Sequence, residues 1–252
     1  WEKAWDITVK TFGFTNHTIL PEALEKWPLE LMENLLPRHL QIIFKINDHL
    51  IKEVQEKFPN DIERIRRMSL VEEGFSKSIR MAHLAIVGSH SLNGVAEIHS
   101  GILKEDVFRD FYDLYPERFN NKTNGITQRR WLKACNPGLS SLINKNIGEG
   151  WITNLYELKA LSSKCDDPGF QDEWRNIKHQ NKERLAKFIL DRVGIKVNLE
   201  SIFDVHIKRF HEYKRQLLNV LHCIILYNRL IKNPEKVTGS YTKIFSGKAA
   251  PG

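Results

Sequence analysis

Residues 201–228 read SIFDVHIKRFHEYKRQLLNVLHCIILYN, and this stretch decides the fold class. Apolar Phe203, Val205 and Ile207 alternate with polar residues, which is the period of a β-strand. Apolar residues then recur at helical spacing from 213 to 225. Residues 241–245 read YTKIF and indicate a second short strand. Strand, helix and strand in this order predict a parallel βαβ unit and therefore an α/β domain.

Four cations lie between this strand and this helix, namely Lys208, Arg209, Lys214 and Arg215. We expect the first pair at the carboxyl end of the strand and the second pair in the opening turns of the helix. The helix macrodipole disfavours cations at a helix start, whereas a bound anion there would attract both the cations and the free amides. Ligands of open α/β sheets also bind beyond the carboxyl ends of strands. The joint therefore predicts a phosphate-like ligand, and the alternative is exposed charges paired with Glu212 and solvent.

The sequence before this unit is mostly helical. A helix is expected to begin at Pro21, and others to cover residues 40–54, 62–68, 95–103, 105–114 and 174–189, with a stop near Gly194. The stretch NNKTNG at 120–125 is polar and turn-forming. We place the domain boundary there, with a mostly helical domain over residues 1–121 and an α/β domain over residues 122–252.

The composition excludes several classes of protein. The chain has 252 residues, a formal net charge of +7 and 41% hydrophobic residues, but no apolar run near the 18 or so that a membrane helix needs. The excess of positive charge is small, and the basic runs adjoin acidic residues, so nucleic-acid binding is disfavoured. Cys135, Cys165 and Cys223 fit neither a zinc motif nor a disulfide framework, which predicts free thiols in a reducing compartment. The chain begins without Met and ends directly after a strand, so we expect a piece of a longer protein.

A few single residues have both a structural and a functional interpretation. His17 lies in a polar loop and is expected to cap a helix, and Asn124 belongs to a turn. Trp131 is expected to anchor the core, and His211 is either a catalytic base or an orienting contact. Residues 247–249 read GKA and lack the Ser or Thr of a phosphate-binding P-loop. The sequence shows no pair of carboxylates typical of a glycosidase and no Ser, His and Asp in the order typical of a serine hydrolase. It also shows no cluster of metal ligands.

Longer blocks follow one another in a fixed order along the chain. They are TNHT at 15–18, LPEALE at 20–25, LPRHLQII at 36–43, RMSLVEEG at 67–74, MAHL at 81–84, GSH at 88–90, NGVA at 93–96, NKTNGIT at 121–127, CNPGL at 135–139, KRFHEYKRQLL at 208–218 and GKAAPG at 247–252. In their order and extent these blocks resemble the α-glucan phosphorylases, the family of glycogen and starch phosphorylase.

The resemblance implies a two-domain architecture of the GT-B glycosyltransferase type with doubly wound sheets, only partly present here. Residues 1–121 would end its N-terminal domain, and residues 122–252 would begin its Rossmann-like C-terminal domain. The implied reaction is phosphorolysis of a terminal α-1,4-linked glucose by inorganic phosphate, giving glucose 1-phosphate with retention. The implied cofactor is pyridoxal 5'-phosphate, whose Schiff-base lysine would lie outside this sequence, so the piece alone would be inactive. The partners would be an α-1,4-glucan and phosphate, and neither nucleic acid nor a membrane would be bound. The full-length enzyme would be an allosteric homodimer, located in the cytoplasm or in a plastid.

The resemblance also assigns roles to the residues of the cation-rich joint. Arg209 and Lys214 match the ligands of the substrate phosphate, and Lys208 matches a contact to the cofactor phosphate. Trp131 matches a residue that lies against the cofactor. His211 would belong to the loop that gates phosphate entry. Such a site needs cations, because two phosphates held close together repel one another.

A second set of residues would hold the sugar. Asn124 and Tyr213 match contacts to glucose hydroxyls, and Val95 matches a residue lining the sugar pocket. His17 matches the residue whose side chain holds the sugar and whose carbonyl faces the forming oxocarbenium ion. Gln128 departs from the family, which usually has Pro there, and is expected to loosen a turn without removing a ligand.

Two other functions stay open at this point. One is a binding module that uses the basic joint for nucleic acid or another anion. The other is a nucleotide-sugar glycosyltransferase with a similar two-domain architecture.

Overall fold

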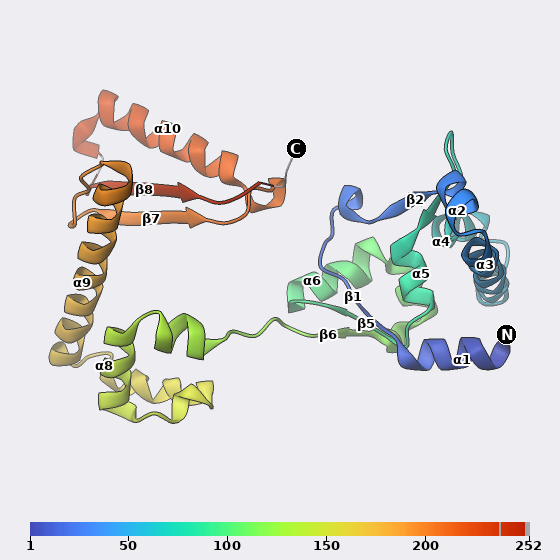
Figure 1. The fold of residues 1–252 in the computed structure, drawn as a ribbon, viewed down its shortest axis with the longest axis horizontal. Coiled ribbons are helices and arrows are strands. Elements are labelled where there is room, and N and C mark those ends of the chain that lie inside the picture. The colour runs from blue at the N-terminus through green and yellow to red at the C-terminus, as the bar shows by residue number, and fades with distance from the viewer. Residues whose placement is uncertain (237, 250–252) are drawn as a thin grey trace. The chain divides into compact units, whose positions relative to one another are not determined.

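A computed structural model describes residues 1–236 and 238–249 (Figure 1). The chain forms two compact units, residues 1–126 and residues 127–252, and each is described by itself. Residues 122–126 group with the first unit, whereas the sequence placed the division at 121/122. The backbone explains this grouping, because the amide of Lys122 donates to the carbonyl of Gly94 at 3.2 Å and the amide of Asn124 donates to that of Val95 at 3.0 Å.

The first unit contains short helices and short strands around one long helix. Its helices are α1 (Glu2–Thr11), α2 (Leu29–Leu35), α3 (Pro37–Lys57), α4 (Ile62–Met68), α5 (Met81–Val87), α6 (Glu97–Ile102) and α7 (Arg109–Leu114). Its strands are β1 (Gly13–Thr15), β2 (Lys26–Pro28), β3 (Val71–Glu72), β4 (Ser78–Arg80), β5 (Ser91–Gly94) and β6 (Phe119–Asn121). Single 3-10 turns cover Pro21–Ala23 and Pro116–Arg118, and a π-helical segment covers Leu103–Val107.

The strands of the first unit form two three-stranded sheets. One is parallel, in the order β1-β5-β6, with Phe14 opposite Leu92 and Asn93 opposite Asn120. The other is antiparallel, in the order β2-β4-β3. The expectation of a mostly helical region missed all six strands, because none exceeds four residues and so none shows a clear alternation. The helix expected from Pro21 is also wrong, since only one 3-10 turn forms before the chain enters β2.

The long helix α3 organises the core of this unit. It begins with Pro37 in its first turn, where the missing N–H costs nothing. Its buried apolar residues recur at spacings of three and four and are Leu40, Ile43, Ile46, Leu50 and Val54. They pack in a cluster with apolar residues of α4, α5, α7 and the strands. The periodicity in the sequence is therefore confirmed as a core-facing stripe.

The predicted break between two helices at residues 59–61 is also confirmed. Asn60 adopts a positive φ of 70°, which an asparagine tolerates better than most residues. Asp61 then caps α4, because its side chain accepts a hydrogen bond from the amide of Arg64 at 2.9 Å.

The second unit combines helices with one small sheet. Its elements are α8 (Pro137–Ile147), α9 (Pro168–Val193), β7 (Ile202–Ile207), α10 (Gln216–Lys232) and β8 (Tyr241–Ser246). A π-helical segment covers Arg129–Ala134, and 3-10 turns cover Gly150–Ile152, Leu155–Lys164, Glu212–Lys214 and Pro234–Lys236. The predicted stop of α9 is confirmed, because Gly194 ends it in a left-handed conformation with φ of 74°.

The predicted βαβ unit is confirmed in the second unit. β7 and β8 pair in parallel over six residues, from Ile202 opposite Tyr241 to Ile207 opposite Ser246, and α10 connects them (Figure 1). Neither α9 nor α10 has a buried residue, and apolar Leu217, Leu221 and Ile224 of α10 stay exposed. The best-packed part of this unit lies instead around Trp151, which is fully buried.

None of the helices in the described part of the chain has both the length and the apolarity that a membrane span requires.

Candidate functional site

The four cations predicted to meet at one joint lie on a single connection, residues 208–215, which we call the basic loop. β7 ends at Ile207 and α10 begins at Gln216, so the loop separates them completely. Lys214 and Arg215 were expected inside the opening turns of the helix, and this detail is wrong. Lys214 closes a 3-10 turn, and Arg215 is the N-cap of α10 in a left-handed conformation with φ of 56°. Among the described residues no side chain caps this helix start, so its first amides keep their capacity to bind an anion.

The backbone of the residues after β8 holds the basic loop. The amide of Lys208 donates to the carbonyl of Ser246 at 3.1 Å, and the amide of Phe210 donates to that of Lys248 at 3.0 Å. Parallel pairing thus continues beyond both strands and brings Lys248 beside the loop. The close approach requires Gly247, because a Cβ at that position would collide with the carbonyl oxygen of Lys208.

Sequence reasoning missed Lys248, because residues 247–249 do not fit a P-loop. The sequence signal that could have found it is the parallel strand pair, because the carboxyl ends of parallel strands meet at one edge of a sheet. With Lys248, five cations belong to this edge: Lys208, Arg209, Lys214, Arg215 and Lys248.

Carboxylates do not neutralise these five cations in the part of the chain that the structure describes. Within residues 1–236 and 238–249, none of them forms an ion pair, and Glu212 forms none either. The alternative in which Glu212 pairs with these charges is therefore not seen. Lys214 is half-buried and the other four are exposed. An uncompensated cluster of this kind, beside uncapped helix amides, has the charge and the donors to bind a phosphate group.

Three neighbouring side chains of the basic loop pack on one another. The ring of His211 meets the ring of Tyr213 edge-on at 4.5 Å, and the Nζ of Lys214 lies 4.7 Å from the centre of the Tyr213 ring. The amide of Tyr213 donates to Nδ1 of His211 at 3.4 Å. The carbonyl of Arg209 accepts a hydrogen bond from Nε2 of Gln216 at 2.9 Å, which ties the loop to the first residue of α10. These contacts give the loop a defined shape, and Lys214 is the one cationic side chain of the loop that takes part in them.

A second group of predicted residues gathers in the first unit. His17 follows β1, Val95 follows β5 and Asn124 follows β6, so all three lie beyond the carboxyl ends of neighbouring parallel strands. The amide of Asn16 donates to the carbonyl of Asn93 at 2.9 Å, and the amide of Asn124 donates to that of Val95. His17 and Asn124 are exposed and Val95 is half-buried. The expectation that His17 caps a helix is wrong, because the 3-10 turn that follows it has no side-chain cap among the described residues.

Two polar residues that sequence reasoning missed lie directly behind this group. Asn16 is 2% exposed, and its Oδ1 accepts hydrogen bonds from the amide of Thr18 and from Nε2 of His99, each at 3.0 Å. Nδ1 of His99 accepts from the amide of Val95 at 3.0 Å. Burial lowers the pKa of His99, and the nearby charge of His17 lowers it further. Nothing local in the sequence links residues that lie 83 positions apart.

Trp131 and Gln128 behave differently from what the sequence indicated. Trp131 is 70% exposed on the π-helical segment, so its interpretation as a core anchor is wrong. Gln128 is buried, and its Nε2 donates to the carbonyl of Ile152 at 2.9 Å. Arg129 donates to the same carbonyl at 3.1 Å. Gln128 therefore fastens the segment to the residues around Trp151 instead of loosening it.

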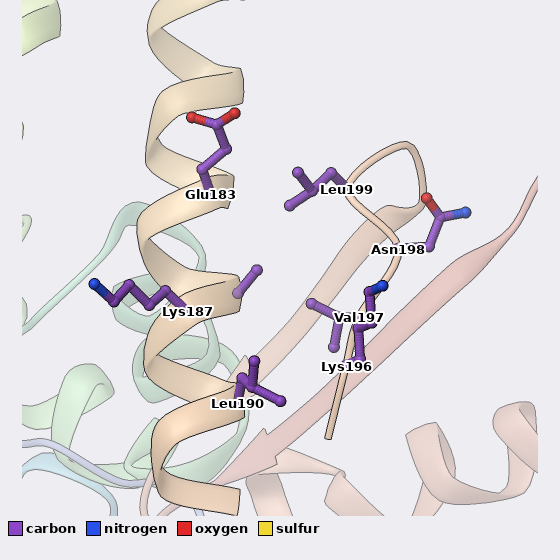
Figure 2. Close-up of a pocket in the computed structure, with 8 residues that line it drawn as sticks. Glu183, Lys187, Leu190, Lys196, Val197, Asn198 and Leu199 are labelled. Carbon is purple, nitrogen blue, oxygen red and sulfur yellow. The ribbon is translucent and has the colours of Figure 1, made fainter. Parts of the chain in front are cut away.

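A pocket of the second unit is a separate feature. It has a volume of about 700 Å³ and lies between α9 and residues 196–199, with Leu199 pointing toward the helix (Figure 2). Leu190 and Val197 contribute to its mainly apolar lining, and none of the predicted site residues borders it. Across the described residues, no group of three or more His, Cys, Asp or Glu side chains lies close enough to hold a metal ion.

Comparison with known proteins gives one consistent result. The family model described as carbohydrate phosphorylase matches residues 1–252. The chain is 55% identical to the muscle form of glycogen phosphorylase from Oryctolagus cuniculus, 56% identical to the liver form from Ovis aries and 55% identical to the brain form from Mus musculus. Each similarity covers 100% of this chain but only 30% of the relative. The chain therefore spans less than a third of the length of these curated relatives.

Proposed function

The chain belongs to the carbohydrate phosphorylase family, and from this premise we propose that it supplies the phosphate-binding and sugar-binding residues of an α-1,4-glucan phosphorylase. The proposed reaction transfers the terminal α-1,4-linked glucose of a glucan to inorganic phosphate. A bond forms between a phosphate oxygen and C1 of the glucose, the bond from C1 to the glycosidic oxygen breaks, and a proton goes to that leaving oxygen. The products are glucose 1-phosphate, with retention at C1, and a glucan shorter by one glucose.

The observation that carries this proposal is the cation cluster of the basic loop. Arg209 and Lys214 would hold the attacking phosphate and stabilise the negative charge on it in the transition state. Their lack of carboxylate partners among the described residues supports this role, because neutralised cations would bind an anion weakly. Tyr213, between His211 and Lys214 in space, would contact a glucose hydroxyl, and His211 would control access to the loop.

The same edge fits the phosphate of pyridoxal 5'-phosphate. Lys208 is exposed directly after β7, is free of ion pairs within the described residues, and would bind that phosphate. The exposed indole of Trp131 is available to lie against the cofactor. When bound, the cofactor would supply a phosphate group able to exchange a proton with the substrate phosphate. The role of this chain is to hold the negative charges near one another, which five cations make less costly.

The sugar-binding part of the proposal uses the parallel edge of the first unit. His17 and Asn124 would hydrogen-bond glucose hydroxyls, and Val95 would line the sugar pocket. The carbonyl of His17 would face the positive charge that develops at C1, which a carbonyl dipole stabilises. These residues follow three adjacent parallel strands, the place where α/β proteins commonly bind ligands.

The proposal extends to architecture and setting. We propose a GT-B type arrangement of two domains, with a boundary near residues 121–126, in a homodimeric and allosterically regulated enzyme of the cytoplasm or a plastid. The mixed α/β composition and the parallel sheets of both units are consistent with such an arrangement. Glycogen, starch and shorter α-1,4-glucans are equally compatible substrates.

The test uses Arg209→Ala and Lys214→Ala in the complete protein that contains this chain. Each change should lower kcat/KM for phosphate by about ten- to a hundredfold, since a hydrogen bond to a charged group contributes about 1.5–3 kcal/mol. The KM for glycogen should change far less. Lys232→Ala is the matched control, because it removes an exposed cation from the other end of α10.

Three outcomes would contradict the proposal. Unchanged phosphate saturation in both variants would remove Arg209 and Lys214 from the site. Retention on a polyanion with a steep loss in rising salt, without phosphorolysis, would favour a nucleic-acid-binding module. Binding of a sugar nucleotide in place of phosphorolysis would favour a nucleotide-sugar glycosyltransferase.

A further inference from the structure

A half-buried imidazole connects the two loops that carry His17 and Val95. His99 lies in α6, and its ring accepts the amide of Val95 at Nδ1 and reaches Oδ1 of Asn16 with Nε2, both at 3.0 Å. Asn16 immediately precedes His17 and is itself almost fully buried. One side chain of α6 thus touches the residue before His17 on one side and the backbone of Val95 on the other.

The hydrogen-bond partners determine where the proton of His99 resides. A backbone amide can only donate, so Nδ1 of His99 must carry a lone pair and no proton. The neutral ring then has its proton on Nε2, which donates to Asn16. A second proton would be placed at Nδ1, where it would face the N–H of Val95 and break that hydrogen bond. The arrangement therefore requires the neutral imidazole.

The residues around the ring favour the same protonation state. His17 approaches from the loop after β1, and its positive charge would repel a charged His99, whereas the carbonyl of Thr18 acts in the opposite direction. Burial is the largest influence and also lowers the pKa of His99. The carboxylate of Glu97, on the same helix, accepts a hydrogen bond from Asn121.

The loop after β1 depends on this network for its shape. Residues 16–20 form neither helix nor strand. Both neighbours of His17 are fixed through Oδ1 of Asn16, which accepts from the amide of Thr18 and from His99. The carbonyl of Val95 also accepts the amide of Asn124. The hydrogen bonds of His99 and Val95 therefore link the loop segments that follow β1, β5 and β6.

We propose that His99 is a positioning residue that fixes His17 and Val95 relative to each other, and that it does so only as the neutral imidazole. This inference rests on the proposed function, in which His17 and Val95 hold the reacting glucose. Acidification would break the bond from Val95 to Nδ1 and loosen the loop after β1. The loss would appear in kcat more than in the KM for phosphate, because the hydrogen bonds of His99 fix the residues proposed to hold the sugar and not those proposed to hold the phosphate.

The test compares two variants of His99 in the complete protein. His99→Phe keeps the ring shape and removes both hydrogen bonds. His99→Gln retains a side-chain N–H that can reach Asn16 but cannot accept the amide of Val95 in the same geometry. His39→Phe is the control, since His39 is exposed on α3, outside this network. Should His99→Phe fail to fold, the milder His99→Gln still separates the two hydrogen bonds.

Two measurements are made on each protein. Hydrogen–deuterium exchange of peptides covering residues 15–20 and 93–97 reports the mobility of both loops. Kinetics of glycogen phosphorolysis between pH 5.5 and 8 report kcat and the KM for phosphate.

In His99→Phe, exchange in both peptides should rise. The value of kcat should fall by about ten- to a hundredfold, which is the usual effect of misplaced substrate contacts. The KM for phosphate should stay within about threefold, and His99→Gln should recover part of kcat. In the unsubstituted protein, exchange of residues 15–20, corrected for its intrinsic pH dependence, should rise as the pH is lowered from 8 to 5.5. This rise should be absent in His99→Phe.

The outcomes separate this inference from the proposed function. If exchange in both peptides is unchanged in folded His99→Phe, His99 does not hold the loops and the inference is overturned. If exchange rises but kcat does not fall, the network is structural and the positioning role is also overturned. If the unsubstituted protein shows no phosphorolysis at all, the proposed function fails, and the exchange data alone decide whether His99 fixes the loop.

Discussion

His83 provides a quantitative test of how burial controls stability in the first unit. It lies on α5, with its ring edge-on to Phe111 at 4.8 Å and Nδ1 at 3.3 Å from the carbonyl of Ser69. It borders a pocket of about 410 Å³, through which the ring retains limited access to solvent. Burial, and then the positive charge of Arg80, lower the pKa of His83 from 6.5 to about 4.

This lowered pKa makes the first unit sensitive to acid. At pH 5 the unfolded chain would bind a proton at His83 and the folded chain would not, so stability falls as the pH drops from about 6.5 toward about 4. With these two pKa values, the loss between pH 8 and pH 5 is about 2 kcal/mol in the free energy of unfolding. Residual solvent access through the pocket makes this figure an upper value.

The perturbation is His83→Phe, which keeps an aromatic ring beside Phe111 and removes the titrating group. The carbonyl of Ser69 keeps a partner, because Nη1 of Arg80 donates to it at 3.1 Å. At pH 8 the variant should therefore lose only about 1 kcal/mol, the contribution of one hydrogen bond. Between pH 8 and pH 5 it should lose about 2 kcal/mol less than the unsubstituted protein.

The assay is urea denaturation at pH 8, 7, 6 and 5, followed by circular dichroism. Phe111→Leu serves as the matched control, since it disturbs the same ring cluster without changing a titratable group. It should lower stability at every pH and leave the pH dependence intact. Equal losses on acidification in His83→Phe and in the unsubstituted protein would refute the reasoning.

Two further predictions concern the second unit. Gly247→Ala places a Cβ against the carbonyl of Lys208, so the basic loop must shift, and the KM for phosphate in the complete protein should rise by about tenfold. Gly74→Ala is its control, because a Cβ there meets open space, and equal phosphate saturation in both variants would contradict the prediction. Trp151→Ala removes the fully buried indole and its hydrogen bond to Asn144, and should cost about 3–5 kcal/mol in urea denaturation. Tyr156→Ala, at a side chain that is 78% exposed, should change stability by about 0.5 kcal/mol or less, and a similar effect of both substitutions would argue against a core at Trp151.

Much of the candidate site could be predicted because its residues are close in sequence. The basic loop lies between a strand and a helix whose periods are visible in the sequence, and a cation-rich segment there already indicates an anion. The residues behind the second group could not be predicted in this way. Asn16 and His99 belong to no local sequence pattern. Their role depends on the hydrogen bond between them, which only the tertiary structure shows.

The sequence by itself determined the local structure, including the βαβ order, the stripe of α3, the break at residues 59–61 and the stop at Gly194. Such features arise because side-chain alternation and helical periodicity depend only on neighbouring residues. Tertiary structure decided which segments meet. Strands as short as β1, β5 and β6 are specified by their pairing partners, and only that pairing gathers His17, Val95 and Asn124 at one edge. It also decided that Gly247 lies against Lys208 and that Trp131 faces solvent, because packing between distant segments depends on contacts that no local pattern encodes.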